Sequence, residues 1–446
     1  MTSAAPALSA GDIRRLRLLA ICVAVIGVAV VCFDLLYLYV PADKTPPQGF
    51  APDIGAAYAR TVPLPQLTFS ARAFTRLSLG LQAAMWAAFF AAIALLRQLA
   101  DGPGERAAFK QIVVGSALAS AALILAPPTL SQDLYHYAMF GRMILTRGLN
   151  PYVTTGEALI GDPIWELACL RDHSTHYGPL FTGLSVVAAA VGGDRPIAMA
   201  LAFKTIATAF GALAAWSIVA LARQERRSCL LPLALVILNP LILIETPGSA
   251  HNEMIMMGLA LAGLVVAGRG RPNLGYALLV GSVHVKWVTA TLVGLYAIAR
   301  LRETPGLPAR VRELAKLLFI AAGVSLLVYL PFWTRAEMMG ATRNLLGGGH
   351  ASGGMRPSQL LLFGAIVVSA IVVVGRSGRR HVFEMTALAC FGFVLFVFPW
   401  WMPWYMIPTF VLLAVGTFGR LNGVVFGLAM VFTLFLMANW AVLMPR

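Results

Sequence analysis

The sequence predicts an all-α, polytopic membrane protein with about 13 transmembrane helices. Of its 446 residues, 59% are hydrophobic and only 12% are charged, a balance that a soluble chain of this size would not have. Apolar runs of roughly 20 residues, enough to cross a bilayer, recur along the chain. Short arginine clusters separate these runs. Together these observations predict one transmembrane domain over residues 1–446.

The apolar runs give the expected order of elements. The first follows a basic patch and is too long for a signal peptide, so it is expected to be an uncleaved span. The expected spans are 17–40, 76–98, 110–128, 196–222, 229–245, 252–268, 315–333, 359–375, 383–401, 404–418 and 421–442. Residues 272–301 are expected to form two short helices whose tip carries His284 to Trp287, and 180–192 a short re-entrant or interfacial helix.

The net charge of +15 does not indicate nucleic-acid binding, because the basic residues lie in loops between apolar runs. That distribution is typical of the cytoplasmic loops of membrane proteins. It places the N-terminus inside. It places outside a large loop at about 129–179, residues 249–253, a glycine-rich loop at about 334–358, and residues 400–405.

The expected outer segments carry most of the unusual polar and aromatic residues. In the first loop, Asp133 precedes an aromatic, amphipathic helix that ends at Gly148-Leu-Asn-Pro-Tyr152, and His176-Tyr-Gly-Pro-Leu180 opens the next helix. The later segments are Ser249-Ala-His-Asn-Glu253, Gly347-Gly-Gly-His350 and Trp400-Trp-Met-Pro-Trp-Tyr405. Functional residues on one side of a membrane indicate a reaction or a binding event on that side.

The pattern of Asp133, Tyr137, Gly148-Leu-Asn150-Pro-Tyr152 and Tyr177-Gly-Pro-Leu180 resembles the first external loop of the glycosyltransferase C superfamily. Within it, Asn239-Pro-Leu, Gly248 to Glu253, Val285-Lys286 and Pro403-Trp-Tyr405 resemble the bacterial polyprenol-phosphomannose-dependent α-1,6-mannosyltransferases. The resemblance covers roughly 130–290 and the patch near 400. The chain departs from the pattern at Glu253, where Asp is usual, and at His136, where a smaller polar residue is common.

The resemblance implies an inverting transfer of a hexose, with mannose expected, from a polyprenyl-phosphate donor to a lipid-linked or glycan acceptor. The reaction would take place at the outer face of a bacterial cytoplasmic membrane, without a cofactor. The alternatives are a transporter or flippase of a lipid-linked sugar, and a non-catalytic scaffold. A transporter should show charges near mid-membrane and an inverted repeat, whereas here the acids lie in outer loops and no repeat is visible.

Asp133 is the predicted catalytic base. Sugar transfer needs a group that takes the acceptor hydroxyl proton and a positive environment for the departing phosphate. A carboxylate at a helix N-terminus is kept ionised by the free backbone N–H groups. The alternative is that Asp133 only caps this helix, with Ser131 as another candidate cap.

The predicted donor-phosphate residues are cations. Lys286 lies in an otherwise apolar helical hairpin, where a lone cation is costly; the alternative is a lysine that reaches the headgroups. His350 lies in the mobile-looking glycine-rich loop, flanked by Arg343 and Arg356, which offer planar forks for phosphate oxygens. For His350, the alternative is a mobile, solvated loop histidine.

The remaining candidates are polar and aromatic residues expected to contact substrate. His251, Asn252 and Glu253 are suited to hydrogen-bond sugar hydroxyls or the catalytic carboxylate, but they also fit a polar helix cap. Trp404 and Tyr405 are suited to stack on sugar, but they also fit an interfacial aromatic belt. The other substrate-binding candidates are Tyr135, His136, Tyr137, Asn150, Tyr152, His176 and Tyr177. The spacing of His and acidic residues fits no compact metal site, so none is predicted.

Overall fold

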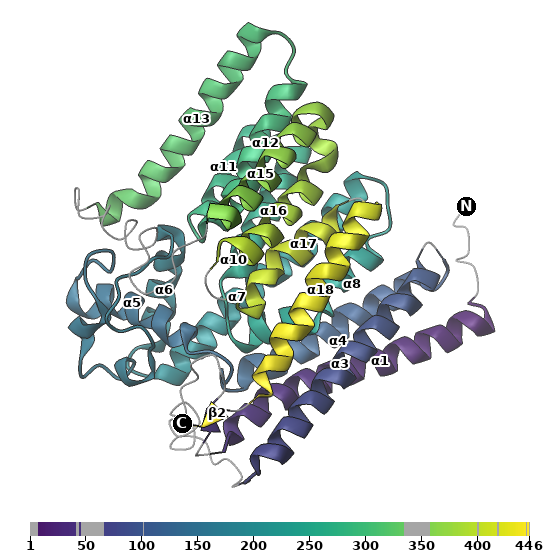
Figure 1. Cartoon of the computed structure of the whole chain (residues 1–446), viewed down its shortest axis with the longest axis vertical. Coiled ribbons are helices and arrows are strands. Elements are labelled where there is room, and N and C mark those ends of the chain that lie inside the picture. The colour runs from purple at the N-terminus through teal and green to yellow at the C-terminus, as the bar shows by residue number, and fades with distance from the viewer. Residues whose placement is uncertain are drawn as a thin grey trace, which may run out of the picture.

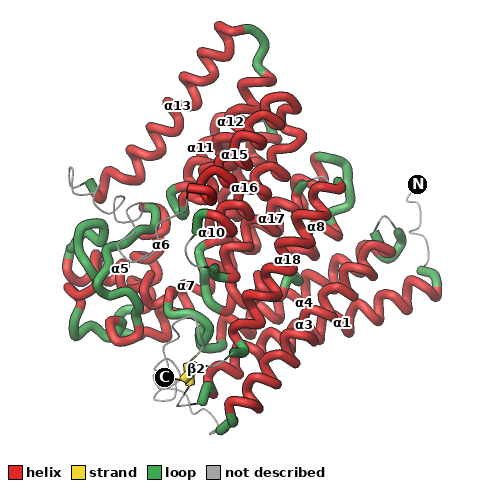
Figure 2. The backbone as a smooth tube through the Cα atoms, in the orientation of Figure 1, coloured by secondary structure: helices red, strands yellow, loops and turns green. Residues whose placement is uncertain are grey.

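The computed structural model describes residues 8–41, 44–45, 67–100, 102–333, 357–398, 401–416, 419–442 and 444–445. Within these ranges the secondary structure is helical (Figure 2), apart from a two-residue antiparallel pair between β1 (Lys44–Thr45) and β2 (Met444–Pro445). In the part of the chain that the structure describes, seven helices are long and apolar enough to cross a membrane, or eight if a bent pair counts as one span. The predicted class, a polytopic helical membrane protein, is confirmed, while the number of crossings stays a prediction.

Three long helices from the N-terminal part lie side by side (Figure 1): α1 (Ala10–Leu36), α3 (Ala71–Leu99) and α4 (Glu105–Leu125). Helix α1 begins with a capping box between Ser9 and Asp12. It ends in the 3₁₀ turn η1 (Tyr37–Tyr39), where the Tyr37 hydroxyl donates to the Trp440 carbonyl at 2.8 Å. This bond ties α1 to the C-terminal helix.

The large loop contains helices of its own. These are α5 (Asp133–Arg147), the 3₁₀ turns η2 (Gly156–Leu159) and η3 (Trp165–Leu167), and α6 (Pro179–Gly192). Figures 1 and 2 show α5 and α6 together on one side of the bundle, surrounded by loops. The short helix predicted at 180–192 is therefore present as α6, packed on α5.

The central segment contains one break that the sequence analysis did not predict. Its elements are α7 (Pro196–Gln224), α8 (Leu230–Ile237), α9 (Pro240–Leu243), the π-helix η4 (Ile244–Gly248) and α10 (Glu253–Gly268). The span expected at 229–245 is bent, because α8 and the α9–η4 segment meet at 52°. Pro240 cannot donate the helical hydrogen bond, and Asn239 caps the new helix by accepting from the Leu241 N–H.

The C-terminal part supplies the remaining helices. They are α11 (Pro272–Val283), η5 (Trp287–Thr289), α12 (Ala290–Glu303), α13 (Leu307–Tyr329), η6 (Leu330–Phe332), α15 (Pro357–Ser377), η8 (Gly378–His381), α16 (Val382–Phe396), η9 (Pro403–Met406), α17 (Ile407–Val415) and α18 (Arg420–Trp440). The two short helices predicted within 272–301 are α11 and α12. The expected span at 404–418 is too long, because the apolar helix covers only Pro403–Val415.

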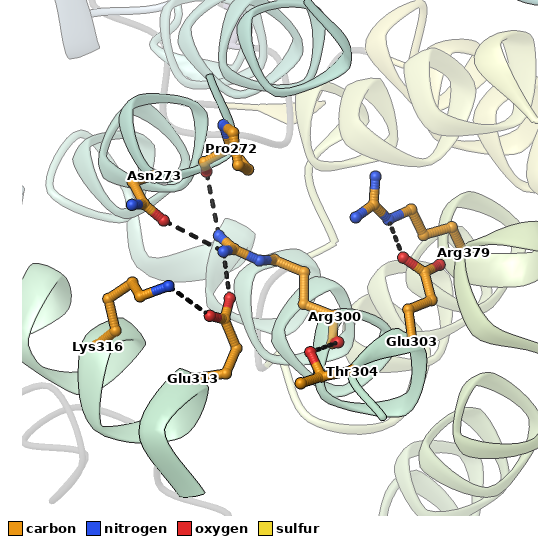
Figure 3. A network of polar contacts seen from close by, with 8 residues as sticks. All are labelled: Pro272, Asn273, Arg300, Glu303, Thr304, Glu313, Lys316 and Arg379. Carbon is orange, nitrogen blue, oxygen red and sulfur yellow. Dashed lines mark hydrogen bonds and ion pairs between the residues drawn. The ribbon is translucent and has the colours of Figure 1, made fainter. Parts of the chain in front are cut away.

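A polar network fixes the end of the α11–α12 hairpin that is remote from its tip (Figure 3). Arg300 of α12 donates to the Pro272 carbonyl at 3.1 Å and to Asn273 at 3.2 Å, and it also pairs with Glu313 of α13. Glu303 pairs with Arg379 of η8 at 2.8 Å. These contacts hold α11, α12, α13 and η8 together. Away from this network, α13 stands apart from the bundle (Figure 1), with 6% of its most apolar stretch buried.

Candidate active site

Asp133 begins α5, and a neighbouring serine leaves its carboxylate available. The Ser131 hydroxyl accepts the Asp133 backbone N–H at 3.1 Å. Ser131, rather than Asp133, therefore satisfies one of the free N–H groups that every helix start leaves. The predicted alternative, in which Asp133 is only a cap, is not what the structure shows. The carboxylate still gains from the positive end of the α5 dipole.

The turn that follows α5 has a structural role in the loop. Gly148 adopts a left-handed conformation with φ of 62°, which ends the helix as a C-cap. The Asn150 side chain then accepts the Tyr152 backbone N–H at 3.0 Å and donates to the Phe332 carbonyl at 2.8 Å. The Tyr152 hydroxyl donates to the Tyr177 carbonyl at 2.8 Å. Asn150 and Tyr152, predicted to bind substrate, thus hold the loop in place.

The His176-Tyr-Gly-Pro segment docks directly on the tip of the α11–α12 hairpin. The Gly178 N–H donates to the Val285 carbonyl at 3.2 Å, and the Leu180 N–H donates to the His284 carbonyl at 3.0 Å. A Cβ atom on Gly178 would lie 2.0 Å from the His284 oxygen, so only glycine permits this approach. The contact brings the Asp133 loop and Lys286 to the same place.

An arginine fixes the far part of the loop. Arg142 of α5 forms two hydrogen bonds with Asp162, at 2.8 and 2.5 Å, and contacts the Gly193 carbonyl at 2.5 Å. Arg142 and Asp162 are both buried. Breaking a buried pair by removing one partner is strongly destabilising, so this pair holds α5, the loop and the α6–α7 turn together.

The Asp133 carboxylate receives groups from three segments. On Oδ2 it accepts the Tyr137 hydroxyl at 3.3 Å, and His251 Nε2 lies 3.5 Å away. The Cys169 thiol lies 3.8 Å from Oδ1. Burial acts to raise the pKa of Asp133, but the contact with His251 and the charges of His251, His136 and Lys286 outweigh it and lower the pKa to about 2. Asp133 is therefore ionised at any physiological pH.

His251 is enclosed between two carboxylates and an indole. Its Nδ1 lies 2.8 Å from Glu245 Oε2, and its ring stacks on Trp404 with centroids 3.9 Å apart and planes 16° apart. Burial favours the neutral ring, but the Glu245 charge and the Asp133 contact prevail and raise the pKa of His251 to about 9. The imidazolium is therefore present at neutral pH, with one nitrogen facing each carboxylate.

Lys286 forms an ion pair with Glu253, the first residue of α10. Its ammonium group also lies 4.8 Å from the centre of the Tyr405 ring, within the range of a cation–π contact. Lys286 is 13% exposed and Glu253 is 1% exposed. Lys286 is therefore not a lone cation in the hairpin, because it pairs with a buried carboxylate.

Asp133 and Lys286 line one small cavity of about 60 Å³. Its polar lining also includes His176, Tyr177, Glu253 and Tyr405, and the rest is apolar: Trp287, Val288, Cys390, Phe393, Val394, Phe398 and Pro408. The volume accommodates about two water molecules, so a bound hexose requires a more open arrangement. The lining combines a carboxylate, an ammonium group and a hydrocarbon wall.

Burial acts on two of the three histidines of the loop, His136 and His176. His136 Nδ1 donates to the Cys169 carbonyl at 2.8 Å, and burial lowers its pKa. Burial, together with the charges of His136 and Lys286, lowers the pKa of His176 to about 3. His136 therefore holds Cys169 beside Asp133, whereas His176 faces the cavity as an uncharged ring.

The structure gathers most, but not all, of the predicted site residues. Tyr137 packs edge-on against Tyr177 at 4.9 Å and contacts Asp133. Tyr135 is completely buried in the hydrophobic core, and it does not line the cavity. Asn252 is also completely buried, directly before α10. His350, Arg343 and Arg356 lie outside the described residues.

Two residues near Asp133 were not selected from the sequence. Glu245 lies in an apolar run that reads as a span, and only its charge there signalled a possible role. Cys169 has no sequence signal that distinguishes it from a structural cysteine. Among the described residues, no group of three or more His, Cys, Asp or Glu side chains is arranged to hold a metal ion.

Comparisons with known proteins match the part of the chain that builds this site. A family model described as "Alpha-(1->6)-mannopyranosyltransferase, N-terminal domain" matches residues 49–302, which include Asp133, Glu245, His251 and Lys286. Residues 403–405 lie beyond the match. No solved structure matches the chain.

Curated relatives carry the same description. Alpha-(1->6)-mannopyranosyltransferase A of Corynebacterium glutamicum is 32% identical over 38% of this chain and 34% of its own length. The protein of that name from Mycobacterium tuberculosis is 30% identical over 47% of this chain and 40% of its own length. The match thus spans less than half the length of these relatives. Since the family model covers more than half of the chain, this protein belongs to the alpha-(1->6)-mannopyranosyltransferase N-terminal domain family.

Proposed function

We propose that this protein transfers a mannosyl residue from a polyprenyl-phosphate donor to a hydroxyl of a lipid-linked or glycan acceptor. The reaction inverts the anomeric centre and takes place at the outer face of the cytoplasmic membrane. The family supports mannosyl transfer. The groups that line the cavity support the donor class, and the distribution of arginines supports the orientation.

The observation that carries the proposal is the composition of the cavity. A polyprenyl-phosphate sugar has a polar sugar, an anionic phosphate and a hydrocarbon tail. The cavity has a carboxylate at Asp133, an ammonium at Lys286 and an apolar wall that includes Trp287, Phe393 and Val394. These three surfaces match the three parts of such a donor in chemical character. A nucleotide sugar would need a second phosphate site and polar contacts for its base.

The chemistry follows from these groups. The acceptor oxygen attacks the anomeric carbon, and the bond from that carbon to the phosphate oxygen breaks with its electron pair. The polyprenyl phosphate leaves as an anion beside Lys286, while Asp133 takes the acceptor hydroxyl proton. A carboxylate with a pKa of about 2 is a weak base, so it accepts this proton late, when the new bond has made the oxygen strongly acidic.

The positions of the arginines indicate which side of the membrane the Asp133 site would face. Asp133 follows α4, and the arginines near the start of α1 and around the α3–α4 turn lie at the opposite ends of these helices. Arginine-rich ends of membrane helices face the cytoplasm. The Asp133 site would therefore face outward, where lipid-linked sugars serve envelope glycan synthesis.

The experiment is an assay of the purified protein with a panel of polyprenyl-phosphate sugars and lipid-linked or glycan acceptors, with products analysed by mass spectrometry. We expect transfer of a hexose from the mannosyl donor, and no product from nucleotide sugars. The Asp133→Asn variant should bind donor but lose about 10²–10⁴-fold in rate, since its amide cannot accept the proton. More than a tenth of wild-type activity in that variant would exclude Asp133 as the base.

A further inference from the structure

The two oxygens of Asp133 have different surroundings. Oδ2 is contacted by both the Tyr137 hydroxyl, at 3.3 Å, and His251 Nε2, at 3.5 Å. Oδ1 lies 3.8 Å from the Cys169 thiol, which is a weak donor. Protein groups thus hold Oδ2 and leave the lone pairs of Oδ1 for a hydroxyl in the cavity.

The backbone before His251 is shaped to bring its ring between Asp133 and Glu245. The π-helix η4 carries Glu245, and Ala250 adopts a left-handed conformation with φ of 57°, which is uncommon for a residue other than glycine. This turn lets the His251 N–H donate to the Glu245 carbonyl at 2.8 Å. Irregular helices and strained residues of this kind concentrate at functional sites.

Glu245 and His251 depend on each other. Glu245 is completely buried and His251 is 1% exposed. The His251 imidazolium, whose Nδ1 lies 2.8 Å from Glu245 Oε2, is the closest compensation for the charge of this carboxylate. A buried charge without a partner is costly, and the Trp404 ring blocks one face along which the imidazole would otherwise move.

We propose that Glu245 is a positioning residue for the transfer reaction. It holds His251 against Oδ2 of Asp133, so that Oδ1 is aimed at the acceptor hydroxyl. This inference rests on the proposed function and deepens it by assigning a role to a residue that does not line the cavity. Glu245 acts only through His251 and touches neither substrate.

Other charged groups face this array and have to be considered in any pH dependence. They are His136 on α5, Glu253 on α10, Lys286 at the hairpin tip, and the buried Asp34 on α1. Lys286 and Glu253 form an ion pair with each other, and Asp34 interacts electrostatically with Lys204. His251 is therefore the cation that directly faces both Asp133 and Glu245.

The Glu245→Gln variant keeps the shape of the side chain and removes its charge. We expect kcat to fall about ten- to a hundredfold, the range seen when a metal-bound histidine loses the partner that orients it, with KM within about twofold. The wild-type rate should fall as pH rises through about 9, where His251 loses its proton. In the variant this alkaline limb should move toward the ordinary histidine value near 6.5. Glu245→Asp should retain an alkaline limb close to the wild-type position.

Two comparisons separate positioning from a general loss of a buried acid. Glu384→Gln, at a buried glutamate of α16 that does not line the cavity, should leave the pH profile unchanged. His251→Gln should lose as much activity as the Glu245→Gln/His251→Gln double variant, because Glu245 has nothing to act on once the imidazole is gone. The double variant also avoids leaving one charge buried alone, should Glu245→Gln fold poorly.

A readout without turnover distinguishes this inference from the proposed function. A histidine whose pKa is raised by folding contributes stability that is complete below about 6.5 and is lost as pH rises through about 9. Wild-type melting temperature should show this loss, and Glu245→Gln should not. If no donor is turned over, the proposed function fails while this coupling can still be measured. An unmoved alkaline limb in Glu245→Gln, or additive losses in the double variant, would overturn the positioning role.

Discussion

Replacement of Lys286 by methionine removes the ammonium group while keeping an unbranched apolar side chain. The structure shows that this change has two separate effects. It removes the cation expected to bind donor phosphate, and it leaves Glu253, which is 1% exposed, without its partner. An assay of the single variant would mix these effects. The informative comparison is with Lys286→Met/Glu253→Gln, which removes both charges of the pair.

The magnitudes can be stated separately. Breaking a buried ion pair by removing one partner costs about 3–5 kcal/mol, so Lys286→Met alone should melt at a clearly lower temperature. In the double variant most of that loss should be recovered. A charge-assisted hydrogen bond to phosphate contributes about 1.5–3 kcal/mol. Its loss corresponds to roughly a ten- to hundredfold weaker donor affinity, which the double variant should still show.

The assay pairs thermal unfolding with direct binding of a short-chain polyprenyl-phosphate mannose in detergent. Glu253→Gln alone is the matched control, because it retains the cation and removes the buried acid. Lys286→Arg should restore affinity only partly, since a planar fork does not replace a compact ammonium. Wild-type donor affinity in a folded double variant would refute the phosphate role. Lys286 would then serve only to neutralise Glu253.

Two further predictions test the sidedness and the loop contact. In a cysteine-free background, Glu157→Cys, at an exposed position, should react with a membrane-impermeant thiol reagent in intact spheroplasts. Arg226→Cys, which is also exposed, should react only after permeabilisation. The reverse labelling pattern would mean that the proposed orientation is inverted. Gly178→Ala should lower stability by about 1–3 kcal/mol and impair transfer, because its Cβ would meet the His284 carbonyl at 2.0 Å. Gly183→Ala, with nothing within 4 Å, is the control and should be neutral.

The fold class follows from the sequence because the bilayer imposes a length and a polarity on every span. Most helices therefore lie close to the predicted ranges, such as α18 at Arg420–Trp440 against an expected 421–442. The errors occur where a local constraint overrides hydropathy. Pro240 bends the expected span at 229–245, and the expected span at 404–418 is a shorter apolar helix, Pro403–Val415. Hydropathy alone shows neither the bend at Pro240 nor the shorter length of the second helix.

The site was only partly predictable for a different reason. Asp133 and His251 lie in motifs that resemble the family pattern, and Lys286 is a charge in an apolar hairpin, so these residues could be proposed from the sequence. Their partners depend on packing. The pairing of Lys286 with Glu253 joins residues 33 positions apart, and the stacking of His251 on Trp404 joins α10's start to η9. A single sequence specifies neither contact, so it could not show that Glu245 faces His251 or that Asn150 bonds to the Phe332 carbonyl.

The charges around the cavity are compensated within the protein, and this determines which atoms remain for substrate. Glu245 faces His251, Glu253 faces Lys286, and Asp34 interacts with Lys204. Each of these carboxylates is almost completely buried, so its charge is useful only through its neighbour. Asp133 differs, because a quarter of its side chain remains exposed and it borders the cavity. The arrangement therefore leaves Asp133 Oδ1 as the carboxylate oxygen best placed to meet a hydroxyl, and Lys286 as the cation best placed to exchange its carboxylate partner for a phosphate.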